Sequence, residues 1–245
     1  MENKAVNSYT ALDLETTGLD PKKDKIIEIG AARVVDGEVK AVYQTFVKPG
    51  RKLSEKVTEL TGITDSMLEG EREQNDAIME LLEFLGDDIL LGHSILFDFS
   101  FVKRCAVNHR LTYEAEAIDT LKIARRGLPD LPSRSLPALC EHFDIRRSSH
   151  RALEDVLATV ELYEKLCEAY YQPDISEFIP QKMIYQVKRE SPATGRQMDN
   201  VRRMMEFYGI TGDYDVESLT RNEASRYIDY MILRYGRIPK DKKKE

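Results

Sequence analysis

The amino-acid sequence predicts an α/β fold built on a mixed sheet, and two observations carry this prediction. Residues 8–47 contain three strand-like apolar segments, and the last two are separated by Asp36-Gly37, a strong signal for a tight hairpin. From there to residue 170 the chain alternates short apolar segments with amphipathic ones. A hairpin beside a buried strand, followed by strand–helix alternation, is typical of a mixed sheet flanked by helices.

The individual elements have recognisable starts and stops. Strands are expected at residues 8–14, 26–35, 39–47, 89–91 and 117–119. Helices are expected at 54–60, 74–85, 97–108, 120–126, 136–143 and 153–170. Gly86 and Gly127 directly follow two of these segments, as glycine does at helix ends.

The charge distribution changes near Ser191. Residues 1–190 carry 25 Lys and Arg against 34 Asp and Glu, a net charge of −9, whereas residues 191–245 carry 11 against 9, a net charge of +2. In the second part, Thr194 is placed to cap one helix, and Thr220 with Glu223 forms a capping box for another.

This pattern predicts the domain organisation. We expect a first domain at residues 1–171, a linker at 172–190, and a small helical hairpin with a basic tail at 191–245. The arginines of the hairpin either form a solvated face or contact a phosphate backbone, and three are candidates: Arg196, Arg202 and Arg203.

Composition bounds the class of protein. The chain has 245 residues and a net charge of −7, which argues against tight non-specific binding of nucleic acid. The sequence shows neither an apolar run of about 18 residues, as a membrane span requires, nor an apolar signal core. Its three cysteines lack CxxC spacing and are expected to be reduced structural thiols: Cys105, Cys140 and Cys167. We therefore expect a cytoplasmic protein without a membrane partner.

Two carboxylates stand at the end of the first expected strand. Asp13 and Glu15 are two residues apart, so they project from the same face of a strand. Two like charges at the mouth of a buried strand repel one another and lose solvation, and a divalent cation offsets both costs. The plain alternative is a solvated strand end, but the turn Thr16-Thr17-Gly18 that follows presents backbone N–H groups beside the acids.

Two further segments carry acids at helix starts. Asp98 falls in the first turn of a helix, where the helix dipole alone favours an acid. His150 and Asp155 are five residues apart, about 140° around a helix, so they cannot face one site from within it. If the helix starts near Arg151, His150 lies on the preceding loop and can fold back beside Asp155.

Together these signals supply four carboxylates and one imidazole. Mg²⁺ and Mn²⁺ prefer carboxylate oxygens, and a pair of such ions activates phosphodiester hydrolysis. A histidine titrates near neutral pH and is suited to take a proton from the attacking water.

The sequence resembles the DEDDh exonucleases of the RNase H-like superfamily, and most closely the proofreading exonucleases of bacterial replicative DNA polymerases. The matching runs are DLETTGLD (13–20), ELTGITDSML (59–68), GHSILFD (92–98) and HRALEDVLAT (150–159). They span residues 8–167, about two thirds of the chain, and their combination is highly specific. The resemblance implies a five-stranded mixed sheet with helices on both faces.

The resemblance also implies roles for individual residues. The metal ligands for two Mg²⁺ (or Mn²⁺) would be four acids: Asp13, Glu15, Asp98 and Asp155. His150 would be the general base. The terminal nucleotide would be held by Thr16, Thr17, Thr61 and Gly62. His93 and Phe97 either line the site or serve packing. Ser94 replaces a common Asn, and Thr61 replaces the His of the separate proofreading subunit, although Thr is usual in the polymerase-embedded form.

The expected function is a 3′-to-5′ exonuclease that acts on single-stranded DNA ends and releases nucleoside 5′-monophosphates. The partners are nucleic-acid 3′ ends, with DNA favoured over RNA, and a polymerase or another replication or repair protein. Two alternatives stay open: a 3′-to-5′ exoribonuclease, and a non-catalytic scaffold that binds nucleic acid. Loss of acidic positions would mark the scaffold, and the sequence retains all four.

Overall fold

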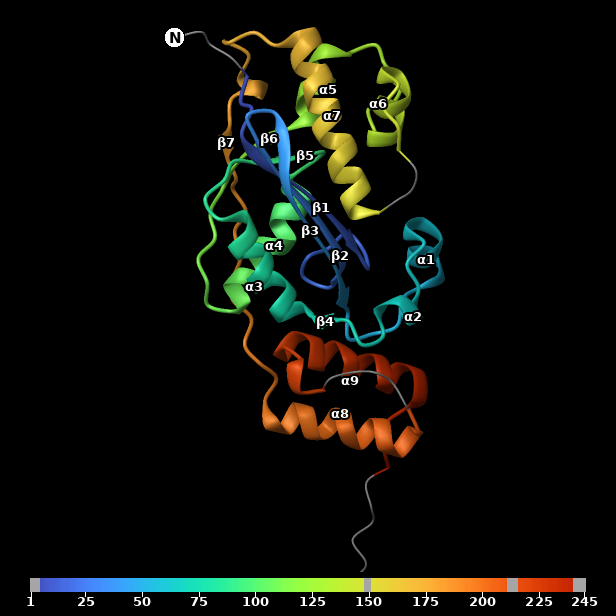
Figure 1. The fold of residues 1–245 in the computed structure, drawn as a ribbon. Coiled ribbons are helices and arrows are strands. Elements are labelled where there is room, and N and C mark those ends of the chain that lie inside the picture. Colours follow the sequence, from blue (N-terminus) through green and yellow to red (C-terminus); the bar gives the residue numbers. More distant parts are fainter. Residues whose placement is uncertain (1–4, 148–150, 211–215, 240–245) are drawn as a thin grey trace, which may run out of the picture. The chain divides into compact units, whose positions relative to one another are not determined.

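The computed structural model describes residues 5–147, 151–210 and 216–239, which form two compact units. The strands of the first unit are β1 (Tyr9–Thr16), β2 (Ile26–Val35), β3 (Glu38–Lys48), β4 (Arg72–Glu73), β5 (Leu90–Gly92), β6 (Glu116–Asp119) and β7 (Gln181–Lys182). Its helices are α1 (Glu55–Thr61), α2 (Asp65–Leu68), α3 (Gln74–Leu85), α4 (Leu96–Asn108), α5 (Thr120–Gly127), α6 (Leu136–Phe143), α7 (Ala152–Tyr170) and the 3-10 helix η1 (Ser176–Phe178). The second unit contains α8 (Gly195–Tyr208), the 3-10 helix η2 (Val216–Ser218) and α9 (Arg221–Tyr235) (Figure 1).

The strands form one mixed sheet in the order β4-β3-β2-β1-β5-β6-β7, with β1 in the middle. β1 pairs antiparallel with β2 and parallel with β5, which confirms the expected mixed sheet. The five expected strands are all present. The sheet extends beyond them by the two-residue strands β4 and β7 at its edges, which are too short to leave a periodic signal in the sequence.

The hairpin between β2 and β3 confirms the signal of Asp36-Gly37. Both residues have positive φ angles, 52° and 80°, as a two-residue turn of this kind requires. The turn fixes the register of β2, and β2 in turn pairs Asp13 of β1 with Gly30 and Glu15 with Glu28.

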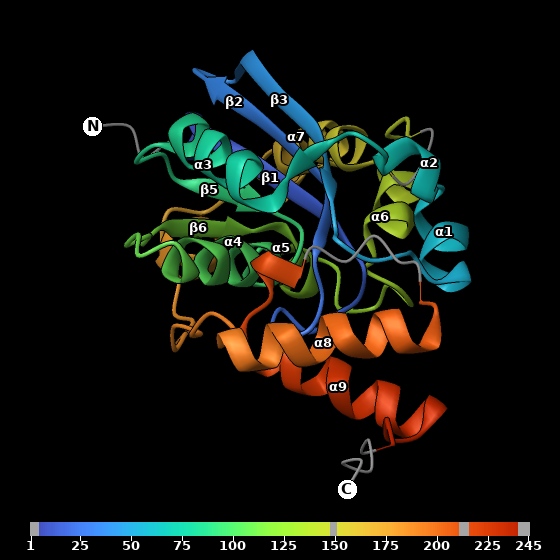
Figure 2. The ribbon, with the colours of Figure 1, turned by 90° about the horizontal axis from the view of Figure 1, so that it is seen from below.

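Helices cover both faces of the sheet, as expected (Figure 2). On one face, α5, α6 and α7 pack against alternate residues of β1, including Tyr9 and Ala11. On the other face, α3 and α4 pack against the intervening residues, including Leu12 and Leu14. Asp13 and Glu15 continue the alternation of Tyr9 and Ala11, so they lie on the face that carries α7.

The structure corrects the expected linker at residues 172–190, because most of this segment packs as part of the first unit. Residues up to Val187 belong to the first unit: β7 pairs with β6, and Phe178 and Met183 are buried in its two cores. The segment has little periodicity because its apolar residues are spread over a 3-10 turn and a two-residue strand.

The second unit has the expected helices and caps. Thr194 and Thr220 each form a complete capping box, and Gly209 follows α8 with a left-handed φ of 62°. The connection differs from the expected hairpin, however, because the two helices run in the same direction. Gln197 near the start of α8 donates to the carbonyl of Arg221 at the start of α9, and Tyr208 at the end of α8 donates to the carbonyl of Gly236.

Among the described residues, no helix combines the length and the apolar character that crossing a membrane would require.

Candidate metal and catalytic site

Three carboxylates converge at the end of the central strand. Asp13 and Glu15 project from one face of β1, and Asp155 projects from the first turn of α7, which packs on that face. Each of the three offers an oxygen atom within 4.8 Å of the oxygens of the other two, the only such group of potential metal ligands found among the described residues. The structure therefore brings together residues that are 140 positions apart in the chain.

Gly30 allows α7 to reach this position. It lies opposite Asp13 in β2, and a Cβ atom there would lie 2.4 Å from the backbone carbon of Ala152 and 2.4 Å from the backbone nitrogen of Leu153. No real Cβ contact is that short, so only glycine lets the start of the helix rest on the strand. The first turn of α7, with Asp155, is thereby placed directly over the strand that pairs with Asp13.

Asp98 binds β1 along the edge of the strand that faces β5. The Thr10 N–H donates to the Ile89 carbonyl at 2.8 Å, so alternate N–H groups of β1 point toward β5. The pairing of β1 with β5 ends near Ala11. Farther along β1, the carboxylate of Asp98 takes the place of a β5 carbonyl, and the Leu14 N–H donates to Asp98 Oδ1 at 3.0 Å. Asp98 is buried and anchored to the same strand that carries Asp13 and Glu15.

The electrostatics of the cluster disfavour charge on its acids. Burial raises the pKa of Asp13 well above its usual value, and the neighbouring charges of Asp98 and Asp155 add to the rise. Burial, with help from Asp155 and Glu28, raises the pKa of Glu15 to about 7. Burial also raises the pKa of Asp98, against the opposing effect of its backbone hydrogen bonds. Such groups gain from a nearby cation.

Arg147 supplies one positive charge to the cluster. Its guanidinium binds both oxygens of Asp155, with Nε on Oδ1 and Nη2 on Oδ2 at 2.9 Å. The same charge lowers the pKa values of Asp13 and Glu15, so it opposes part of the repulsion among the acids. One guanidinium does not neutralise four carboxylates.

The donor set fits a hard divalent cation. It consists of carboxylate oxygens, with neither thiolate nor imidazole among the three clustered ligands, and this composition suits Mg²⁺ or Mn²⁺ better than zinc or copper. The raised pKa values show that the fold holds these acids together at an electrostatic cost, as expected of a metal centre.

His150, the expected general base, lies outside the described residues. The residues on either side of the gap are described, and both make ion pairs next to the cluster. Arg147 binds Asp155, and Arg151 binds Glu28. The role of His150 therefore stays a prediction.

The hydroxyl groups of Thr16 and Thr17 shape the turn after β1. Thr16 donates to the carbonyl of Gly18 at 2.7 Å, and the Lys25 N–H donates to the hydroxyl of Thr17 at 3.0 Å. These bonds hold the turn close to Glu15 at the end of β1. A role in holding the terminal nucleotide stays a prediction.

Thr61 and Gly62 end helix α1. The buried hydroxyl of Thr61 donates to the Val57 carbonyl at 2.9 Å and accepts the Ile63 N–H at 3.1 Å. Gly62 has a left-handed φ of 70° and caps the helix by donating its N–H to Thr58. The hydroxyl of Thr61 is therefore used within the fold, and a role of Thr61 and Gly62 in holding a nucleotide stays a prediction.

His93 and Phe97 make contacts within the fold. Both ring nitrogens of His93 are engaged, Nδ1 with the hydroxyl of Thr120 and Nε2 with the Arg134 carbonyl, each at 2.9 Å. Phe97 packs against Phe101, with ring centroids 5.0 Å apart. These contacts support the packing alternative for both residues.

The backbone explains the common Asn at position 94. Ser94 has a φ of 71°, a left-handed conformation that Asn tolerates better than Ser. The Ser94 N–H donates to Asp119 Oδ1 at 2.9 Å, and the same oxygen accepts the Leu121 N–H at 3.0 Å. The backbone at Ser94 is thus held by a carboxylate at the end of β6.

Sequence patterns alone assigned no functional role to four residues around the cluster: Glu28, Gly30, Arg147 and Arg151. Two of them left a signal. Glu28 is an acid within a mostly apolar strand. Gly30 interrupts the same strand, which often marks a close backbone approach. Arg147 left no signal, because its pairing with Asp155 depends on a loop and on a helix start.

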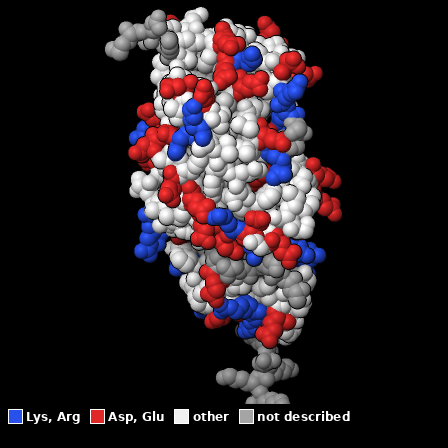
Figure 3. Space-filling view, viewed as in Figure 1, with Lys and Arg blue, Asp and Glu red and all other residues white. Residues whose placement is uncertain are grey.

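Acidic and basic side chains are interspersed on the face shown in Figure 3, where acidic residues are prominent. This agrees with the net charge of −7. Binding of a phosphate backbone on such a surface would depend on local cations more than on a broad positive field.

Comparisons with known proteins found similar sequences and structures. The model of the exonuclease family RNase_T matches residues 10–163. The "DNA polymerase III subunit epsilon" of Aquifex aeolicus is 34% identical over 169 residues, which cover 68% of this chain and 84% of that protein. The "DNA polymerase III PolC-type" of Bacillus subtilis is 32% identical over 243 residues, 92% of this chain but 17% of that much longer protein.

Solved structures show the same fold. Exonuclease X, in complex with 5′ overhanging duplex DNA, is 25% identical with a TM-score of 0.54, over 67% of this chain and 95% of that one. Escherichia coli exonuclease I, in complex with a dA16 oligonucleotide, is 20% identical with a TM-score of 0.56, over 67% of this chain and 41% of that one.

Proposed function

Because the chain belongs to the RNase_T exonuclease family, we propose that it is a 3′-to-5′ exonuclease that removes nucleotides from single-stranded DNA ends by a two-metal mechanism. The observation that carries the proposal is the convergence of Asp13, Glu15 and Asp155 within 4.8 Å, with Asp98 anchored to the same strand. The products would be nucleoside 5′-monophosphates.

In this proposal the acids hold two Mg²⁺ or Mn²⁺ ions through Asp13, Glu15, Asp98 and Asp155. When bound, such ions neutralise phosphate charge and lower the pKa of water. The protein contributes the arrangement: β1 presents Asp13 and Glu15, and α7 presents Asp155. His150 accepts the proton of the attacking water, and the turns at Thr16-Thr17 and Thr61-Gly62 hold the terminal nucleotide.

DNA is the proposed substrate because the similar proteins are named as DNA polymerase III components, and exonuclease X was solved with DNA. A polymerase, or another replication or repair protein of the cytoplasm, is the proposed partner on the same ground. The division of the chain near residue 187 supports a nuclease unit with an appended helical unit.

The proposal is tested with three labelled substrates: single-stranded DNA, duplex DNA with a mismatched 3′ end, and RNA. With Mg²⁺ or Mn²⁺, a 5′-labelled DNA strand should shorten stepwise, and a blocked 3′ end should stop the reaction. EDTA should abolish activity. Preference for RNA would replace the DNA assignment, and full activity in chelator would overturn the metal mechanism.

Variants connect the activity to the cluster. Asp13→Asn and Asp155→Asn should each lower the rate by several orders of magnitude while the protein stays folded, because an amide cannot neutralise a divalent cation. Asp130→Asn, at an exposed acid in a turn, is the matched control and should keep normal activity.

A further inference from the structure

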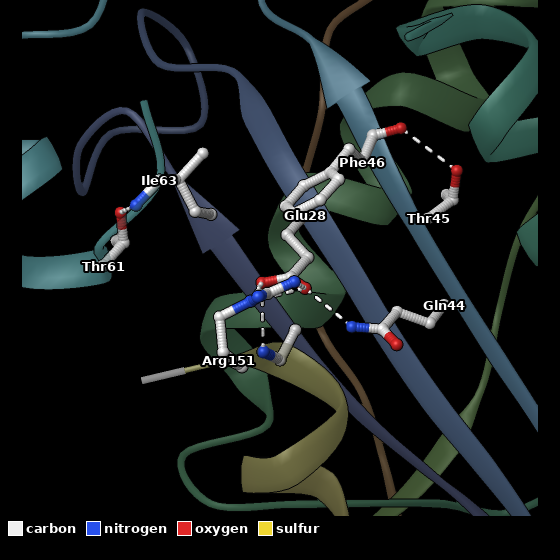
Figure 4. A network of polar contacts seen from close by, with 8 residues as sticks. Glu28, Gln44, Thr45, Phe46, Thr61, Ile63 and Arg151 are labelled. Carbon is white, nitrogen blue, oxygen red and sulfur yellow. Dashed lines mark hydrogen bonds and ion pairs between the residues drawn. The ribbon is translucent and has the colours of Figure 1, made fainter. Parts of the chain in front are cut away.

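Glu28 is a fully buried acid near the start of β2, where it lies opposite Glu15. Its carboxylate is completely engaged. Arg151 Nη2 donates to Oε1 at 2.8 Å, Arg151 Nε lies 3.1 Å from each oxygen, and Gln44 Nε2 donates to Oε1 at 2.9 Å (Figure 4). The Ala152 N–H donates to Oε2 at 3.2 Å.

This network lies at the start of α7. Ala152 is the first residue of the helix, and its N–H would otherwise lack an intrahelical partner. The carboxylate of Glu28 therefore caps the helix from the neighbouring strand, and its charge favours the helix N-terminus. Two residues along the same face of β2, Gly30 contacts the backbone of Ala152 and Leu153.

The first turn of α7 is thus fixed to β2 at two points, by the carboxylate of Glu28 and by the bare backbone of Gly30. Asp155 stands on that turn, and its N–H donates to the Arg151 carbonyl at 3.0 Å. Any shift of the turn along β2 would change the distance from Asp155 to Asp13.

Arg151 extends the network toward α1. Its guanidinium lies over the ring of Phe46, 4.9 Å from the ring centroid. Phe46 packs in turn against the cluster that contains Val57 and Ile63, on either side of the proposed nucleotide pocket at Thr61-Gly62. Arg151 therefore contacts both Glu28 of β2 and Phe46 of β3, and Phe46 packs on the core next to α1.

We infer that Glu28 and Arg151 are positioning residues of the metal site, whose ion pair sets the placement of Asp155 against Asp13 and Glu15. This inference rests on the proposed function, since it assumes that these acids bind metal. Neither residue touches the reacting atoms; both act through the first turn of α7.

Charge alone predicts a different outcome, which makes the inference testable. Arg151 is a cation near Glu15, so its removal would strengthen metal binding if only its charge mattered. Positioning predicts weaker binding. Removal of both charges together, in a Glu28→Gln/Arg151→Met double variant, leaves the net charge unchanged and avoids an unpaired buried acid.

The experiment measures Mn²⁺ binding to the full-length chain by isothermal titration calorimetry, without nucleic acid. Arg151→Met and the double variant should each bind Mn²⁺ about 10- to 100-fold more weakly than the unaltered chain, as is typical when a residue that orients metal ligands is lost. Arg151→Lys keeps the charge but loses the bidentate geometry, so its Mn²⁺ affinity should lie between those of the unaltered chain and Arg151→Met. Arg146→Met, at an exposed neighbouring arginine, is the matched control and should bind normally.

Urea unfolding of each variant separates positioning from loss of fold, because affinity is compared only between folded proteins. Equal or tighter Mn²⁺ binding by a folded Arg151→Met variant would overturn the inference, and so would unchanged binding by the double variant. If the unaltered chain bound no Mn²⁺, the proposed function itself would fail, so the two failures are distinguishable.

Discussion

Arg147 binds Asp155 through both carboxylate oxygens, and both side chains are largely buried. Asp155, a proposed metal ligand, is thereby paired with a fixed positive charge of the protein. Four residues later, Arg151 makes a comparable ion pair with Glu28, an acid behind the cluster. The two arginines flank His150 in the sequence, but we expect opposite effects on metal binding: Arg147 competes with a cation for Asp155, whereas Arg151 helps to position Asp155 for it.

We expect Arg147→Gln to strengthen metal binding. The guanidinium repels a cation at Asp155 and competes for its oxygens, so its loss should tighten Mn²⁺ binding by about tenfold. Calorimetric titration measures this, with Arg146→Gln as the exposed control of equal charge change. Weaker binding by Arg147→Gln would mean that this arginine orients Asp155 rather than competing with the metal.

Gly30→Ala should disturb the site through the backbone. The added methyl group would overlap the start of α7 at 2.4 Å, so the helix must move. We expect a loss of about 1–3 kcal/mol in the free energy of unfolding, together with weaker Mn²⁺ binding. Gly195→Ala, where the added Cβ would meet nothing within 4 Å, is the control. Unchanged stability and affinity in Gly30→Ala would contradict the close packing of α7 on β2.

The raised pKa of Glu15 predicts how stability depends on pH. Its pKa is about 7 in the folded protein and 4.5 ordinarily, so the folded state binds more protons between these values. In chelator, the free energy of unfolding should therefore fall as pH rises from about 4.5 to about 7. Glu15→Gln should flatten this decline, which urea titrations at several pH values would detect. A rise in stability over that interval would refute the prediction.

His150→Ala tests the expected general base. The rate should fall by about 10²- to 10⁴-fold while Mn²⁺ affinity stays close to normal. Activity of the unaltered chain should rise with pH through the range near pH 6.5 where an imidazole loses its proton, and the variant should lack that rise. If the variant instead lost its metal and kept the pH profile, His150 would be a ligand or a structural residue.

Removal of residues 188–245 tests the second unit. The boundary follows the division of the chain, and all four proposed metal ligands precede it, so the truncated protein should fold and bind Mn²⁺. If Arg196, Arg202 and Arg203 contact phosphates, the full chain should bind long single strands more tightly, with a steeper salt dependence. Arg202 is ion-paired with Asp199 and Glu217, so we expect it to contribute less to phosphate binding than the other two arginines. Equal salt slopes for both proteins would instead favour docking of a protein partner.

The sequence by itself determined the elements and the acids. Period-two and helical patterns, together with Gly37, Gly86 and the threonine caps, are local signals, and they placed most strands and helices within a few residues of those observed. The D-x-E spacing put Asp13 and Glu15 on one face because side chains alternate along a strand. Asp98 and Asp155 stood out at expected helix starts, and the resemblance to a known family then implied a metal-ligand role for all four acids.

Only the tertiary structure decided what surrounds those acids. The pairing of Arg151 with Glu28 depends on where the start of α7 rests on a strand over 120 residues away in sequence. The pairing of Arg147 with Asp155 depends on how the loop before α7 meets the first turn of that helix. The parallel course of α8 and α9 and the packing of residues 176–183 into the first unit likewise arise from contacts between distant segments. Local patterns report which face of an element is apolar, whereas the partner of a buried charge is set by the packing of whole elements.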